Sequence, residues 1–281
     1  MISQDTQRNG RNLWSVRLRA VMLAAAMIGS SGGCLTTEFV SSDEPRTVTQ
    51  AVAKRDLGID YLSSRRTAMA IRELRASLNL DSDDPQTHLW LGECYRRKGR
   101  MEEAETYLLE SIRLSVGDDT ESLTEQAARL TLSALLSQMG QYEDSLEHCE
   151  ALTEDATFGT PWMSLTNCGW ALMKLGRTDE ARAHFDEALD FFPRFGQALL
   201  NLGILQTEEG HALLAIRTLQ RAIDSGRLAD PGMSEAHFRL GEIYVGLGRR
   251  DMAVEQFEAS TIKSPYGDWG TQSQAYLDIL H

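Results

Sequence analysis

The stretch LGIDY at residues 57–61 decides the fold of this chain, because it returns 34 residues later as LGECY at residues 91–95. An alanine follows each copy at the same distance, Ala70 after the first and Ala104 after the second. Self-similarity at a fixed period of roughly 20 to 50 residues is the sequence signature of repeat architectures. The chain therefore reads as an array of short, similar units.

Further copies continue towards the C-terminus. Each has a glycine in a first segment and an alanine followed by a large apolar residue in a second: Gly169 with Ala181 and Phe185, Gly203 with Ala215 and Leu219, Gly241 with Ala253 and Phe257. A degenerate copy lies between them, with Ser133, Ser145 and Cys149 at the matching places. The pattern resembles the tetratricopeptide repeat (TPR), in which each unit is a pair of antiparallel helices. We expect the glycine to face the alanine where the paired helices cross, since small residues allow close approach.

This resemblance implies an all-α protein, a right-handed α-solenoid of six helix pairs at residues 51–84, 85–118, 126–159, 162–195, 196–229 and 234–267. The glycines expected at the turn inside each pair fix the register: Gly99, Gly140, Gly176, Gly210 and Gly248. With this register the extra residues fall between repeats, where loops tolerate insertions. An apolar stripe over residues 268–281 predicts a helix that caps the last repeat.

The first 34 residues resemble a bacterial lipoprotein signal. Four arginines precede an apolar stretch at residues 20–28, which is too short to cross a hydrocarbon core of roughly 30 Å as a helix. Glycine and serine then lead to Cys34. The resemblance implies removal of residues 1–33, lipidation of Cys34 and, because Leu35 follows in place of aspartate, export to the outer membrane with the body facing the periplasm. The alternative is an ordinary secretory signal cleaved nearby, since Ser31 stands where lipoproteins usually have an aliphatic residue.

Residues 34–50 are polar, rich in serine and threonine, and lack helical periodicity. We expect them to form a flexible tether between the lipid and a TPR body at residues 51–281.

The composition argues against several functions. A formal net charge of −13 opposes binding to the phosphate backbone of nucleic acid. The six histidines show no metal-ligand spacing, and each glycine already has a place in a helix crossing or a turn, so no phosphate loop is expected. Carboxylates cluster at expected helix starts, where the helix dipole explains them. We predict no catalytic residues, metal, cofactor or small-molecule substrate; an enzyme with a site hidden in the repeats is the alternative.

The cysteines other than Cys34 fall into two groups. Cys94 takes a small buried position and is expected to be an inert core thiol. Cys149 is placed on a second helix and Cys168 on the first helix of the following repeat, so the two could form a disulfide in an oxidising periplasm. Two reduced core thiols are the alternative.

The first helices of a TPR stack line its concave side, and this side is expected to be largely apolar. The residues placed there are Val52, Ile59, Leu62, Leu89, Leu130, Met163, Trp170, Met173, Leu200, Ile204, Phe238 and Val245. A continuous apolar trough suits an amphipathic helix or an extended segment of a protein partner. The alternative for any one of these side chains is that it packs between repeats.

A lipidated cysteine, a short tether and six TPRs together resemble the pilotin lipoproteins of type IV pilus systems, the PilF, PilW and Tgl family. The opening unit, DLGIDYL at residues 56–62 followed by AIREL at residues 70–74, carries the closest likeness. The resemblance implies a non-catalytic scaffold that binds the outer-membrane secretin of the pilus and promotes its multimerisation. A general TPR lipoprotein serving β-barrel insertion or polysaccharide export is the alternative.

The anchor yields a first testable prediction. Cys34→Ala should leave the body folded but move the protein from the outer membrane to the soluble or inner-membrane fraction, because the acyl chains supply the anchoring. Fractionation followed by blotting measures the shift, and mass spectrometry of the wild-type mature N-terminus should find acylated Cys34. An unmodified N-terminus at another residue would contradict the prediction.

Overall fold

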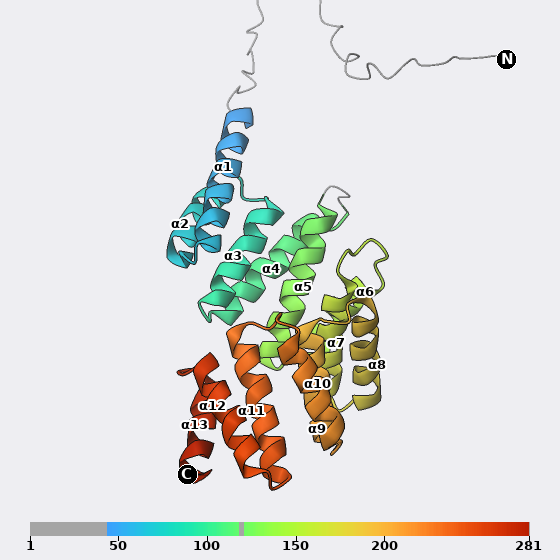
Figure 1. The fold of residues 1–281 in the computed structure, drawn as a ribbon. Helices are drawn as coiled ribbons and strands as arrows, with labels where there is room; N and C mark the ends of the chain where they lie inside the picture. Colours follow the sequence, from blue (N-terminus) through green and yellow to red (C-terminus); the bar gives the residue numbers. More distant parts are fainter. Residues whose placement is uncertain (1–43, 118–120, 281) are drawn as a thin grey trace, which may run out of the picture. The chain divides into compact units, whose positions relative to one another are not determined.

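The computed structural model describes residues 44–117 and 121–280, and within them every regular element is an α-helix (Figure 1). The helices are α1 (Glu44–Ser63), α2 (Thr67–Leu78), α3 (Pro85–Arg97), α4 (Met101–Ser115), α5 (Ser122–Met139), α6 (Tyr142–Thr153), α7 (Pro161–Lys174), α8 (Thr178–Phe191), α9 (Gly196–Glu208), α10 (Ala212–Asp224), α11 (Asp230–Gly246), α12 (Arg250–Lys263) and α13 (Asp268–Leu280). None of these described helices is both long and apolar enough to cross a membrane.

The helices form an α-solenoid of six antiparallel pairs. Each first helix contacts its own second helix, and each second helix contacts the next first helix. The first helices α1, α3, α5, α7, α9 and α11 also contact one another in sequence, whereas second helices of different repeats do not meet in the described part of the chain. The first helices therefore form the inner layer of the stack, and α13 covers α11 and α12 at its end.

In five of the six repeats a glycine of the first helix marks the closest approach within the pair. A Cβ atom on Gly58 would lie 2.6 Å from Cγ of Leu74, and one on Gly169 would lie 2.6 Å from Cε1 of Phe185. A Cβ on Gly58 would also lie 3.3 Å from the Ala70 carbonyl oxygen, so the glycine does lie opposite the alanine, although the nearest atoms belong to another residue. The glycine meets the residue one helical turn beyond the alanine, while an alanine such as Ala181 is fully buried beside this contact.

The turns inside the pairs follow the glycine register. Gly99, Gly140, Gly176, Gly210 and Gly248 all have φ between 69° and 81°, the left-handed region that side chains with a Cβ rarely adopt. The first repeat has Arg65 at the equivalent place, with φ 59°. The left-handed turn is thus kept even where the sequence lacks glycine.

Three boundaries differ from the sequence prediction. Helix α1 begins at Glu44, so residues 44–50 are helical and their assignment to a flexible tether is wrong; residues 34–43 lie outside the described part. Periodicity missed this segment because residues 48–50 are exposed, the Val48 side chain by 51%. The extra residues before repeats three and six lengthen α5 and α11 at their N-terminal ends, beginning at Ser122 and Asp230, rather than forming loop alone.

The hydrophobic core is divided within the third repeat. One cluster of buried side chains runs from α1 to α5, and another begins at Leu146 on α6 and continues to α13. Serines occupy the α5–α6 crossing: Ser145 Oγ donates to the carbonyl oxygen of Ser133 at 2.7 Å and lies 2.9 Å from Ser137 Oγ. We call this crossing the polar seam.

A disulfide joins Cys149 of α6 to Cys168 of α7, with the Cα atoms 5.6 Å apart and both side chains fully buried. It links the third repeat to the fourth directly beyond the polar seam. Cys94 is the one free cysteine among the described residues, and burial raises the pKa of its thiol to about 12. Such a thiol stays protonated and unreactive at neutral pH.

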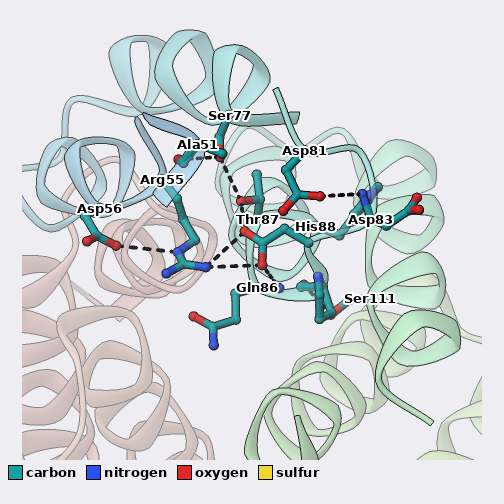
Figure 2. A network of polar contacts seen from close by, with 12 residues as sticks. Ala51, Arg55, Asp56, Ser77, Asp81, Asp83, Gln86, Thr87, His88 and Ser111 are labelled. Atoms are coloured by element: carbon teal, nitrogen blue, oxygen red, sulfur yellow. Dashed lines mark hydrogen bonds and ion pairs between the residues drawn. The ribbon is translucent and has the colours of Figure 1, made fainter. Parts of the chain in front are cut away.

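A buried polar network holds the first repeat against the second (Figure 2). Arg55 Nη1 lies 3.0 Å from a carboxylate oxygen of Asp84, and both side chains are nearly buried. Asp84 also accepts from the Gln86 backbone N–H and so caps the start of α3. Ser77 Oγ donates to the Ala51 carbonyl oxygen at 2.7 Å, which ties the end of α2 to α1.

Repeat packing gives a stability prediction. Ala181→Arg should lower the free energy of unfolding by about 3 kcal/mol or more, because a long cation would enter a fully buried helix crossing. For a domain of this size the melting temperature should fall by roughly 10 °C. Ala183→Arg, on the exposed side of the same helix, is the control and should melt close to wild type. Equal melting temperatures for both variants would mean that the repeat register is wrong.

The disulfide gives a second prediction. Thiol counting on the unfolded, non-reduced Cys34→Ala protein from the periplasm should find one free thiol, that of Cys94. Reduction should lower the stability of the body by about 3 kcal/mol, because the bridge closes a short loop in the unfolded chain. Detection of three free thiols would exclude the bridge.

Candidate functional site

The inner layer of first helices bears two adjoining hollows. The central hollow has a volume of about 560 Å³ and is lined by Ala134, Ser137, Gln138, Tyr142, Thr166, Asn167, Trp170, Gln197, Asn201 and Glu235. The N-terminal hollow has a volume of about 370 Å³ and is lined by Glu93, Arg96, Leu130, Thr131, Ala134, Met163, Thr166, Asn167, Phe195 and Gln197. Because they share four residues, the hollows form one groove that crosses α3, α5, α7, α9 and α11.

The predicted groove residues divide into three groups. Leu130, Met163 and Trp170 line the hollows. Ile59 is partly buried, and Val52 and Val245 are exposed, but all three lie outside both hollows. The remaining six are buried in the core, which corrects their assignment to a binding surface: Leu62, Leu89, Met173, Leu200, Ile204 and Phe238.

Packing of each first helix against the neighbouring first helix or, at the end of the stack, against the capping helix explains this burial. Phe238, for example, is only 2% exposed and its ring lies 5.1 Å from Trp269 and 5.9 Å from Tyr276, both on the capping helix α13. An apolar residue on the inner side of a first helix therefore fills the junction with its neighbour. The expected continuous apolar trough is wrong, and polar side chains make up much of the groove lining.

The floor of the central hollow is built from amides. Asn167 Nδ2 donates to Ser133 Oγ at 2.9 Å and so bridges α7 to α5. Gln197 Nε2 donates to Asn201 Oδ1 at 2.9 Å along α9. Beside them the Trp170 ring carries the Lys174 ammonium 4.4 Å from its centroid, a cation–π contact.

Charge differs between the two hollows. In the N-terminal hollow Glu93 accepts from Arg96 and Arg97, each at 2.7 Å. Burial alone would raise the pKa of Glu93, but the two arginines outweigh it and hold that pKa below its ordinary value. In the central hollow, burial raises the pKa of the Glu235 carboxyl, and the charges of Arg239 and Lys174 offset this only in part.

Sequence reasoning missed the polar lining although the repeat register contained it. Gln197 lies one 34-residue period after Met163, and Glu235 takes the same place in the sixth repeat. Aligning every first helix on its glycine would have placed both residues on the inner side. The search for an apolar stripe passed over them because neither is apolar.

The arrangement suits recognition of a polypeptide. The described residues contain no group of three or more histidine, cysteine or acidic side chains that could hold a metal ion. Amides, an aromatic ring and isolated charges in an open groove are the groups that bind backbone and side chains of an extended segment.

Comparison with known proteins supports this reading of the fold. The family pattern described as tetratricopeptide repeat matches residues 55–119, 168–226 and 208–268, together more than half of the chain. No curated protein sequence matches the chain.

Solved structures match it closely in fold. PilW, described as a widely conserved type IV pilus biogenesis factor, superposes with a TM-score of 0.66 at 17% identity, covering 81% of this chain and 98% of PilW. Pseudomonas aeruginosa pilF gives a TM-score of 0.62 at 15% identity and covers 82% of this chain and 99% of its own. A chain of the APC/C hetero-tetramer Cut9-Hcn1 gives a TM-score of 0.68 at 17% identity. The match covers 84% of this chain but only 44% of that chain. At these identities the likeness shows the fold alone.

The family pattern, the left-handed turns and the glycine at five of the six helix crossings agree, and the chain belongs to the tetratricopeptide repeat family.

Proposed function

We propose that this chain is a non-catalytic lipoprotein of the outer membrane that binds the type IV pilus secretin from the periplasm and promotes its assembly into multimers, supporting pilus formation and pilus-dependent motility. The observation that carries the proposal is the extent of the likeness to PilW. The likeness covers 81% of this chain and 98% of that pilus biogenesis factor, whereas a Thermus thermophilus TPR protein that is also matched over 98% of its own length covers only 69% of this chain.

Two further features support the proposal. The Cys149–Cys168 disulfide suits an oxidising compartment such as the periplasm. The lipoprotein-like signal ending at Cys34 would place the chain on the membrane in which a secretin assembles. The identification of the secretin as the partner comes from the resemblance of the sequence to the pilotin lipoproteins.

The groove suggests how such a scaffold acts. A segment of an unassembled subunit would lie across α3 to α11, with its backbone hydrogen-bonded to the amides of α7 and α9 and an apolar side chain against Leu130 or Trp170. Holding an exposed segment prevents its premature association, and release follows when the subunit contacts of the multimer compete for it. Binding energy alone drives this cycle, so no bond is made or broken.

Co-purification tests the proposed partner. The full-length lipoprotein, solubilised from outer membranes in mild detergent, should bring down the secretin. Recovery of barrel-assembly or polysaccharide-export proteins in its place would reject the secretin in favour of another envelope machine.

Substitution in the groove tests the proposed surface. Trp170→Glu combined with Leu130→Glu should reduce heat-resistant secretin multimers and piliation, because aromatic anchors at the centre of an interface contribute about 2 kcal/mol or more. Helical content and membrane location should stay unchanged. The matched control is Leu213→Glu, which adds a charge at a 66% exposed leucine of α10 outside both hollows.

Full multimer formation in the folded double variant would contradict the assignment of the groove. A defect in the Leu213→Glu control and not in the double variant would move the binding surface to the turns between paired helices.

A further inference from the structure

The central hollow has a single ionised side chain in its lining, the carboxylate of Glu235 at the start of α11. Only 18% of this side chain is exposed, so most of its hydration has been lost. A carboxylate at such a place needs a compensating cation or hydrogen-bond donor.

The compensation that the protein supplies is incomplete. Arg239 lies 3.5 Å from Glu235, but it also lies 3.2 Å from Glu242, so one guanidinium serves two carboxylates. The same guanidinium is held 4.7 Å above the Trp269 ring of α13. Burial accordingly raises the pKa of Glu235 despite this neighbour. A further cation in the hollow would find an underneutralised carboxylate.

The opposite wall of the hollow already attracts a cation. The Trp170 ring faces the Lys174 ammonium at 4.4 Å, and no carboxylate lies within ion-pair distance of that lysine among the described residues. The ring thus contacts the lysine without an ion pair, and the charge of the lysine acts on Glu235 only at longer range. An aromatic face and a carboxylate on two sides of one hollow are the two groups that together recognise an alkylammonium or guanidinium side chain.

The helix between these two walls suits the backbone of a ligand. Helix α9 lies between α7, which bears Trp170, and α11, which bears Glu235. Gln197 and Asn201 of α9 line the hollow, and each amide has donor and acceptor capacity beyond the one hydrogen bond that joins them. Peptide groups of an extended chain can pair with that capacity.

We propose that the central hollow is a specificity pocket for a lysine or arginine side chain of an extended polypeptide, with the cationic head at Glu235, the aliphatic stem along Trp170 and the backbone over Gln197 and Asn201. This inference rests on the proposed function of the groove as a binding site for a partner segment, and it adds the chemistry that selects the segment.

Charge complementarity favours this occupant over others. The chain carries a formal net charge of −13, which attracts basic segments and repels acidic ones. A metal ion is disfavoured because Glu235 belongs to no group of three acidic, histidine or cysteine side chains in the described part of the chain. The volume of about 560 Å³ accommodates a long side chain together with part of the backbone that bears it.

Selection from a random peptide library tests the proposal without a known partner. The probe is a displayed library panned on the purified Cys34→Ala protein, and the expected result is enrichment of lysine or arginine at one fixed position. Replacing that residue by alanine in a synthetic peptide, or acetylating its lysine, should weaken binding about tenfold, the value of one charge-assisted hydrogen bond.

Variants with matched controls locate the pocket. Glu235→Gln should abolish the preference for a basic residue and weaken binding of the selected peptide about tenfold. Glu255→Gln removes an equal charge at an exposed position of α12 outside both hollows, so it should retain the preference. Lys174→Ala should strengthen binding a few-fold, because it removes the cation that competes for the Trp170 ring. Circular dichroism and melting curves check the fold of each variant.

The proposal is overturned if the enriched peptides share no basic position, or if folded Glu235→Gln selects the same basic peptides as wild type. Either result can occur while the secretin still co-purifies, in which case the proposed function survives and this pocket does not. If basic peptides are selected and depend on Glu235 but no secretin co-purifies, the pocket survives and the partner is a different protein.

Discussion

The close contact inside each helix pair is the constraint on which the rest of this structure depends. In the sixth repeat a Cβ on Gly241 would lie 2.5 Å from Phe257, so only glycine lets the large ring of the second helix lie against the backbone of the first. Five of the six repeats share this contact in the form of glycine against leucine or phenylalanine. Because these five pairs have the same kind of crossing, successive first helices fall into one layer, and that layer carries the groove. The geometry of the groove thus follows from residues that do not line it.

The fold could be predicted from the sequence because the repeat period reflects that contact between paired helices. Glycine, alanine and the turn glycines recur at fixed distances, so helix pairs, turns and the capping helix could all be predicted. The groove was harder. Leu200 and Trp170 are both apolar and both lie on the inner side of a first helix, yet the first is buried by a neighbouring helix and the second lines a hollow. That difference depends on the angle between repeats, which no single repeat encodes. The helical residues before Ala51 were also missed, since the exposed side chains at 48–50 leave no periodic apolar pattern.

The groove combines two kinds of chemistry over a short span of helices. Around Glu93 the two arginines give a local excess of positive charge, while around Glu235 one arginine is shared between two carboxylates. A ligand that crossed both hollows would therefore meet opposite local charges at its two ends, which would fix its direction as well as its position. Uncharged amides lie between them and would pair with a peptide backbone.

The polar seam in the third repeat also bears on how the chain unfolds. In a stacked array cooperativity is passed on only through contacts between neighbours, so a break in the apolar core bears on how far it extends. Ser133 takes the glycine place of α5 and Ser145 the alanine place of α6, and together with Ser137 they exchange hydrogen bonds at the point where one cluster of buried side chains ends and the next begins. The disulfide links α6 to α7 on the C-terminal side of this crossing and does not link α5 to α6. We therefore expect helices α1 to α5 and helices α6 to α13, which carry separate core clusters, to lose structure in separate steps, with the disulfide-linked block last.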